Sequence, residues 1–64
     1  MTTPSAEILK ANRLFYGLTQ REAAQLIHVS TKTWSQYEQD RRKIHEGFYE
    51  LFIIKASKVA QLDK

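Results

Sequence analysis

A chain of 64 residues without cysteine is long enough for one small domain, 1–64, and excludes disulfides and thiolate metal sites. Ten lysines and arginines against seven acidic residues give a net charge of +3, which favours an anionic partner without identifying one. No motif predicts a cofactor, a metal or a small-molecule ligand, and no apolar stretch or signal peptide indicates a membrane, so we expect a cytoplasmic protein.

The first predicted helix covers about residues 5–16 and follows a lead, 1–4, that we expect to be flexible. Ser5 or Thr3 can cap this helix, because either hydroxyl can accept a hydrogen bond from an amide of the first turn. Gly17 comes next and is typical of a helix that ends on a left-handed residue. The apolar positions of the helix are Ile8, Leu9, Ala11, Leu14, Phe15 and Tyr16.

The second predicted helix covers about residues 20–27. Thr19 and Glu22 have the spacing of a capping box. In this motif the Thr hydroxyl accepts a hydrogen bond from the Glu backbone amide, and the Glu carboxylate accepts one from the Thr backbone amide. A helix that ends at Gly17 and another that begins after Thr19 predict a tight corner. One face of the second helix is apolar at Ala23, Ala24 and Ile27.

The helical pattern breaks after residue 27 and resumes at residue 31. We expect His28 to adopt the left-handed conformation, Val29 to plug the turn, and Ser30 to cap the third helix. Two short helices joined by so short a turn at a steep angle make a helix-turn-helix, here at residues 20–38.

The third helix, about residues 31–38, is expected to bury Trp34 and Tyr37, which lie one turn apart. The aromatic spacing favours the core over base stacking for Trp34. The positions left to face outward are Thr31, Lys32, Thr33, Ser35 and Gln36.

A polar loop, 39–43, leads to a final helix at about residues 45–62, and no segment predicts a strand. The expected fold class is therefore all-α, a compact bundle of four to five helices.

The final helix is apolar around most of its circumference. Phe48, Leu51 and Phe52 are expected to cover the core. The remaining apolar residues are predicted to form a homodimer interface at Tyr49, Ile53, Ala56, Val59 and Ala60. A monomeric bundle that packs all of them is the alternative.

The segment LTQREAAQLIHVSTKTWSQYE resembles the helix-turn-helix of the lambda repressor/Cro-like family, also called the XRE family. The match falls at Leu18, Thr19, Gln20, Ala24, Val29, Ser30, Thr33 and Glu38. His28 and Asp40 depart from the family, which usually has Gly at the first position and commonly at the second. The resemblance implies a lambda repressor-like fold and a buried ion pair between Arg13 and Glu38.

In that family the third helix enters the major groove of double-stranded DNA, led by its N-terminal residues. Gln36 and Lys32 are the best candidate base readers, since Gln can bind adenine and Lys guanine, and Thr31, Thr33 and Ser35 lie beside them. The alternative reading is that these are ordinary solvated helix residues. Predicted phosphate contacts are Thr19, Gln20, Arg21, Arg41, Arg42 and Lys43, of which the last three could instead form a solvated turn.

Together these features predict a sequence-specific repressor that binds an inverted-repeat operator as a homodimer and regulates its own operon. The later part of the chain is similar to small phage-type regulators, some of them of the anti-CRISPR-associated group. The alternative is an antitoxin-type module whose apolar C-terminal helix binds a partner protein. An enzyme is not expected, because the chain has no cysteine nucleophile, no Gly-rich phosphate loop and no His with an evident acidic partner.

Overall fold

The computed structural model of the chain describes the backbone of residues 4–62 and the side chains of residues 4–60. It contains four helices: α1 (Ala6–Phe15), α2 (Gln20–Leu26), α3 (Thr31–Glu38) and α4 (Glu46–Leu62). The described range contains no strand, which confirms the all-α class, and none of its helices could cross a membrane. Three of the four residues of the predicted flexible lead, 1–3, lie outside the described residues.

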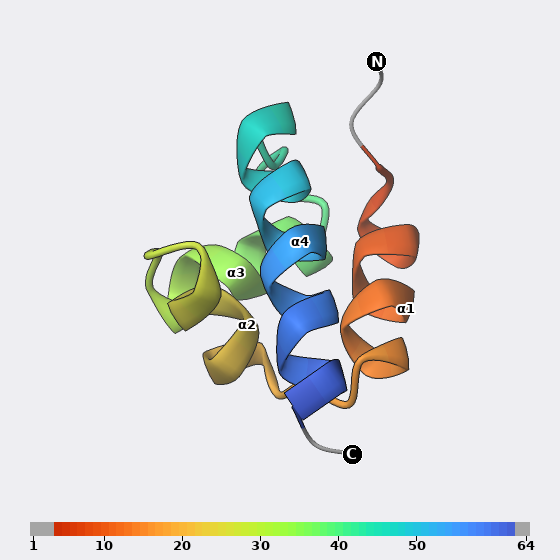
Figure 1. Cartoon of the computed structure of the whole chain (residues 1–64). Helices are drawn as coiled ribbons and strands as arrows, with labels where there is room; N and C mark the ends of the chain where they lie inside the picture. Colours follow the sequence, from red (N-terminus) through yellow and green to blue (C-terminus); the bar gives the residue numbers. More distant parts are fainter. Residues whose placement is uncertain (1–3, 63–64) are drawn as a thin grey trace.

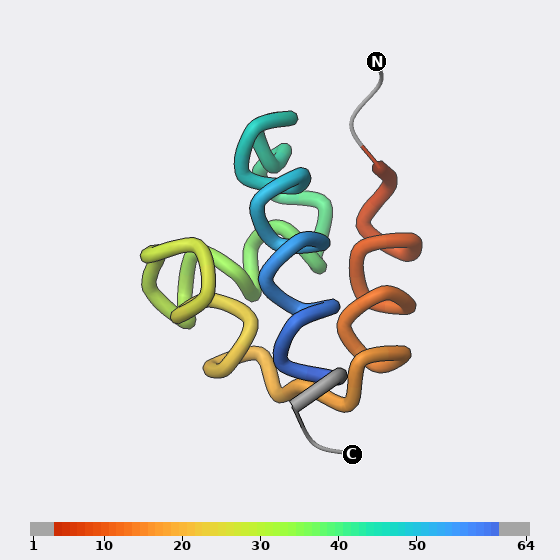
Figure 2. The backbone as a smooth tube through the Cα atoms, viewed as in Figure 1, coloured from red at the N-terminus to blue at the C-terminus, as the bar shows by residue number. Residues whose placement is uncertain are grey.

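The helices surround one core, with α1 and α4 side by side and running in the same direction, and α3 crossing behind α4 (Figure 1). Two contacts confirm that α1 and α4 are parallel. Asn12 of α1 binds Tyr49 of α4, and Tyr16, one turn later in α1, packs its ring against Phe52, which also lies later in α4. The backbone tube shows α2 and α3 meeting at a sharp corner (Figure 2). This corner is the helix-turn-helix.

The first three helices end in the same way, with one residue in the left-handed conformation. These residues are Gly17 (φ 71°), His28 (φ 61°) and Asp40 (φ 61°), so the expectation for His28 is confirmed and Asp40 replaces a glycine in the same role. In each case the amide after the left-handed residue donates back to a carbonyl in the last turn, which is the Schellman motif. The three bonds are Leu18 N to Arg13 O, 3.1 Å, Val29 N to Ala24 O, 3.0 Å, and Arg41 N to Gln36 O, 3.0 Å.

The starts of these helices are capped by the hydroxyl residues expected from the sequence. Ser5, Thr19 and Ser30 each accept a hydrogen bond from an amide of the first turn. The capping box of α2 is complete, with Glu22 N donating to Thr19 Oγ1 at 3.1 Å and Thr19 N donating to Glu22 Oε1 at 2.9 Å. The corner between α1 and α2 is therefore determined by local hydrogen bonds on both sides.

Trp34 and Phe52 lie at the centre of the core, where both side chains are fully buried and their ring centroids are 4.9 Å apart. Tyr37 is buried beside Trp34, so both aromatic residues of α3 point inward as expected. The buried hydrophobic residues are Leu9, Leu18, Ala23, Ala24, Ile27, Trp34, Tyr37, Ile44, Phe52 and Ala56.

The expected division of α4 between core and dimer interface is partly wrong. Ala56 is fully buried in the chain's own core, because it lies one turn after Phe52 on the same face, and it cannot contribute to a dimer interface. Phe48 was expected in the core but is 42% exposed, since the first turn of α4 extends past the core and its ring meets His45. The other predicted interface residues are half-buried: Tyr49, Ile53, Val59 and Ala60.

Large apolar residues are exposed on α1 as well as on α4, where Ile54 is 54% exposed. Phe15 is 82% exposed, Leu14 57% and Ile8 52%, whereas Leu9 of the same helix is 1% exposed. A helix on the surface of a small bundle buries only one stripe, and in α1 that stripe passes through Leu9 and Arg13. Exposed apolar surface is therefore found on the first helix as well as on the last, and its most exposed member, Phe15, lies on the first.

Candidate nucleic-acid interface

The outward face of α3 is polar, because its apolar residues Trp34 and Tyr37 are turned into the core. The five predicted base-reading residues lie on or beside this outward face. Thr31 and Lys32 are exposed, and Thr33, Ser35 and Gln36 are half-buried. The eight residues of α3 make about two turns of helix, so its outward face is short and presents few side chains.

The predicted base-reading residues differ in whether their polar groups already form hydrogen bonds within the protein. Thr33 belongs to the cap of α3, since its amide donates to Ser30 Oγ at 3.1 Å and its hydroxyl accepts from Ser30 Oγ at 2.9 Å. Within the described residues, the side chains of Thr31, Lys32 and Gln36 make no hydrogen bond with the protein. These three side chains are free to bind an external ligand.

Gln39 is a candidate that the sequence analysis missed. It is the C-cap of α3, it is exposed, and its Nε2 donates to Ser35 Oγ at 2.9 Å. Lys32, Ser35 and Gln36 precede it by seven, four and three residues, which places all four on one helical stripe. Helical spacing is the signal that identifies Gln39, although its polar neighbours 40–43 favoured a loop from residue 39 on.

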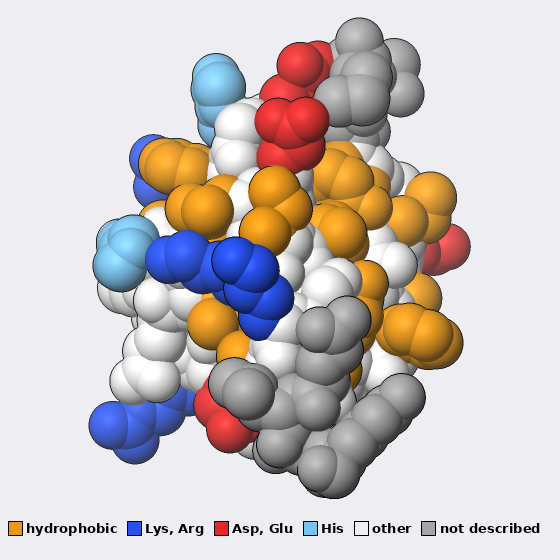
Figure 3. Space-filling view, in the orientation of Figure 1, with side chains coloured by type: hydrophobic (Ala, Val, Ile, Leu, Met, Phe, Trp, Pro, Cys, Tyr) orange, Lys and Arg blue, Asp and Glu red, His pale blue; other side chains and the backbone are white. Residues whose placement is uncertain are grey.

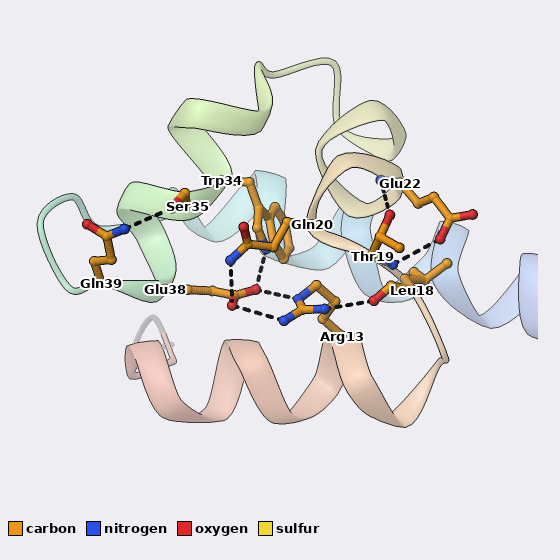
Figure 4. A network of polar contacts seen from close by, with 9 residues as sticks. All are labelled: Arg13, Leu18, Thr19, Gln20, Glu22, Trp34, Ser35, Glu38 and Gln39. Carbon is orange, nitrogen blue, oxygen red and sulfur yellow. Dashed lines mark hydrogen bonds and ion pairs between the residues drawn. The ribbon is translucent and has the colours of Figure 1, made fainter.

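Behind this face, the carboxylate of Glu38 joins three elements through a network of hydrogen bonds (Figure 4). Arg13 of α1 donates from Nε to Oε2 at 2.6 Å and from Nη2 to Oε1 at 3.2 Å. Gln20 at the start of α2 donates from Nε2 to Oε1 at 3.1 Å, and the indole nitrogen of Trp34 donates to Oε2. The ion pair expected between Arg13 and Glu38 is thus present, with two additional donors.

The same network reaches the corner between α1 and α2, where Arg13 Nη1 donates to Leu18 O at 2.8 Å. The side chains of Arg13 and Glu38 are only 10% and 5% exposed, so the charges are largely removed from water. Burial by itself raises the pKa of the Glu38 carboxyl. Hydrogen bonds from Arg13, Trp34 and Gln20, with the charge of the guanidinium, outweigh burial and hold the pKa of Glu38 below its ordinary value. Glu38 is therefore an anion that fixes the angle of α3.

Gln20, predicted from the sequence as a phosphate contact, also holds α3 in place. Its amide nitrogen braces α3 through Glu38. An amide group has two N–H donors, and the contact with Glu38 uses one of them. The predicted contact between Gln20 and a phosphate stays a prediction, and the second N–H is the donor that would make it.

The basic residues predicted to bind phosphate are all exposed: Arg21 on α2, and Arg41, Arg42 and Lys43 in the loop after α3. The loop begins at the Schellman motif, where Arg41 N binds Gln36 O at 3.0 Å, so its first residue is tied to the end of α3. The hydroxyl of Thr19 accepts the Glu22 amide and serves as a helix cap. The arginines are therefore better placed for phosphate than the Thr19 side chain.

Comparisons with known proteins agree with this geometry. A family model described as a helix-turn-helix domain matches residues 6–53, which cover α1 to α3 and the first half of α4. The chain is also 44% identical over 43 residues, 67% of its length, to the Type II methyltransferase M.MspI of Moraxella sp. It spans only 10% of that methyltransferase. Because the family model covers most of the chain, this protein belongs to the helix-turn-helix domain family and is a DNA-binding domain.

Proposed function

We propose that the protein is a sequence-specific regulator of transcription that represses by occupying its DNA site. The observation that carries this proposal is the outward stripe of α3, where Lys32 and Gln36 are free while Glu38 fixes the helix from behind. A rigid helix with unengaged polar side chains suits base recognition, because discrimination requires side chains held in a fixed register against the base edges.

The reading mechanism follows from the chemistry of the outward stripe. With the N-terminal end of α3 leading into the major groove, Lys32 donates to guanine O6 and N7, and Gln36 pairs with adenine N6 and N7. The methyl group of Thr31 packs on a thymine methyl. Arg41, Arg42 and Lys43 hold the flanking phosphates, which supplies affinity without sequence information.

The finer proposal is a repressor of the lambda repressor/Cro-like (XRE) type, from a phage or mobile element, that acts in the cytoplasm on its own operon. An anti-CRISPR operon is one candidate. Two copies on an inverted repeat place their α3 helices in successive major grooves, about 34–36 Å apart. Four residues of α4 remain available for the contact between these copies: Tyr49, Ile53, Val59 and Ala60. We propose no catalytic role.

The alternative, an antitoxin whose last helix binds a partner protein, is less favoured. Phe52 and Ala56 of α4 are fully buried in the chain's own core, and the hydroxyl oxygen of Tyr49 accepts a hydrogen bond from the side-chain amide of Asn12. The inner face of α4 is therefore used within the chain, which leaves a partner protein only the half-buried and exposed residues of its outer side.

Footprinting on the DNA that flanks the protein's own gene tests the proposed function. We expect a protected site with two related halves, and loss of protection for the double variant Lys32→Ala/Gln36→Ala. The matched control is Lys58→Ala, which removes one exposed positive charge from α4 and should protect the same site. Binding of equal strength to every DNA sequence would contradict sequence-specific regulation.

A further inference from the structure

The outward face of α1 is apolar and stays largely exposed within the described part of the chain, although the Phe15 ring meets the neighbouring Tyr16 ring edge-on. It consists of Ile8, Ala11, Leu14 and Phe15, which we call the α1 face. Phe15 is the most exposed large hydrophobic residue of the described chain, at 82%. Single exposed apolar residues are normal, but three large ones on a ten-residue helix form a patch.

The opposite side of α1 holds the helix firmly on the core, so this exposure does not come from a loosely packed segment. Leu9 is buried, Arg13 is bound to Glu38 and Leu18, and Tyr16 contacts the Phe52 ring. Ile8, Ala11 and Phe15 follow one another at intervals of three and four residues. This spacing is the seam by which one helix packs along another.

The α1 face lies away from the part of the molecule that meets DNA. In the close view of the polar network, α1 forms one side of the domain, while the turn between α2 and α3 and the start of α3 form the other (Figure 4). The space-filling view shows hydrophobic side chains gathered over α4 and α1 on the face turned away from α3 (Figure 3). A partner bound there leaves Lys32 and Gln36 uncovered.

We propose that the α1 face is a docking surface for a second copy of this chain. A surface that binds its own copy must be complementary to itself about a two-fold axis. An axis passing α1 between Ala11 and Asn12 sets Ile8 against Phe15 of the second copy. The small side chain of Ala11 then lies at the crossing and lets the two helices approach closely.

The area and charge of the face fit this occupant. At their exposed fractions, Ile8, Leu14 and Phe15 present on the order of 400 Å² of apolar surface with Ala11. A standard interface buries about 800 Å² per partner, of which a little over half is apolar, so the face supplies about the apolar share that a dimer needs. The opposite charges of Glu7 and Lys10, both exposed on α1, cancel, so two copies do not repel each other there. A lipid surface fits less well, because a membrane-surface helix carries a basic excess.

The consequence for DNA binding rests on the proposed function. Two copies joined through α1 carry their α3 helices on opposite sides of the pair. Such a pair cannot place both helices on one face of a single duplex, so it joins two separate DNA segments. The contact through α1 is therefore distinct from the contact between neighbouring copies on one inverted repeat.

Sedimentation of the full chain without DNA tests the pairing itself. We expect self-association that increases with concentration, and a dissociation constant raised at least about tenfold by Phe15→Lys, which leaves the residues of the α4 contact unchanged. Phe48→Lys is the matched control, since it places the same charge at an exposed phenylalanine of α4 and should leave the dissociation constant unchanged. Circular dichroism of each variant checks that the fold is kept. A wild type that stays monomeric at every concentration, or equal effects of the two variants, would overturn the proposal.

A capture assay tests the consequence. One DNA fragment carrying the footprinted site is fixed to beads and a second, labelled fragment is added with the protein. Wild type should capture the labelled fragment, and Phe15→Lys should not, although it protects the site in a footprint. A dimer that captures no second fragment overturns the back-to-back arrangement. If no variant protects any DNA, the proposed function fails, while sedimentation still decides the pairing.

Discussion

Arg13 and Glu38 form a two-point ion pair, 2.6 Å at its shorter contact, across 25 residues of sequence. This contact connects the helix on one side of the domain to the end of the helix proposed to read DNA. Since Gln20 and Trp34 donate to the same carboxylate, a few buried polar groups fix the end of α3 in addition to the packing of its own apolar residues.

Breaking this pair should destabilise the domain strongly. Arg13→Met leaves the Glu38 carboxylate buried without its main partner, at a cost of about 3–5 kcal/mol in the free energy of unfolding. Urea denaturation followed by circular dichroism measures the change. Lys10→Met, on the exposed side of α1, is the control and should alter stability by less than about 0.5 kcal/mol. A loss below 1 kcal/mol for Arg13→Met would show that water replaces the guanidinium at little cost.

The lowered pKa of Glu38 predicts that stability falls in acid. A carboxyl whose pKa is lower in the folded than in the unfolded state stabilises the fold fully above the unfolded pKa. This contribution is lost as the pH falls through the lower, folded pKa. We expect the difference in unfolding free energy between wild type and Glu38→Gln to be largest near neutral pH and to shrink below pH ~4. A difference that stays constant with pH would show that packing, and not charge, accounts for the effect of the substitution.

Removing a base-reading side chain should change specificity before it changes general affinity. Gln36→Ala, and separately Lys32→Ala, should relax discrimination at one base pair per half-site and cost about 1–3 kcal/mol on the preferred site. Competition binding against a set of single-base operator variants measures this. Equal weakening on every operator variant would mean that the residue contacts only the backbone.

The loop after α3 should contribute affinity that depends on salt. Arg42→Ala should weaken binding to all DNA sequences and reduce the slope of log affinity against log salt by about one unit. Binding isotherms over a range of salt concentrations provide the slope, with Lys58→Ala on α4 as a charge-matched control. An unchanged slope would remove Arg42 from the DNA interface.

The residues in the left-handed conformation at the helix ends predict opposite changes in stability for substitution to alanine and to glycine. Gly17→Ala should cost about 1 kcal/mol through backbone conformation alone, because a Cβ at this position meets no atom within 4 Å. His28→Gly should stabilise by about 0.5 kcal/mol, since relief of the steric strain of a Cβ at φ 61° exceeds both the loss of an exposed contact with Lys55 and the larger entropy that glycine loses on folding. Thermal unfolding of both variants measures the shifts. Stabilisation by Gly17→Ala would contradict the conformational argument.

The amino-acid sequence by itself determined the helices, their caps and the turn, because these depend on neighbours within a few residues. Ser5, Thr19 and Ser30 cap where they were expected to, and His28 turns the chain although it is not glycine. The inward direction of Trp34 and Tyr37 also followed from the helical period alone.

Only the tertiary structure decided which apolar surface remains exposed. Periodicity shows that a helix has an apolar stripe, but which stripe is buried depends on the direction from which the other helices pack. This is why Ala56 proved to be core and Phe15 exposed. The Gln20 amide joins the Arg13–Glu38 pair only in the assembled fold, since this hydrogen bond spans 18 residues, whereas Trp34 and Glu38 lie one turn apart on α3. The sequence thus determined the helix-turn-helix, and the packing of α1 and α4 against it decided which face is left for a partner.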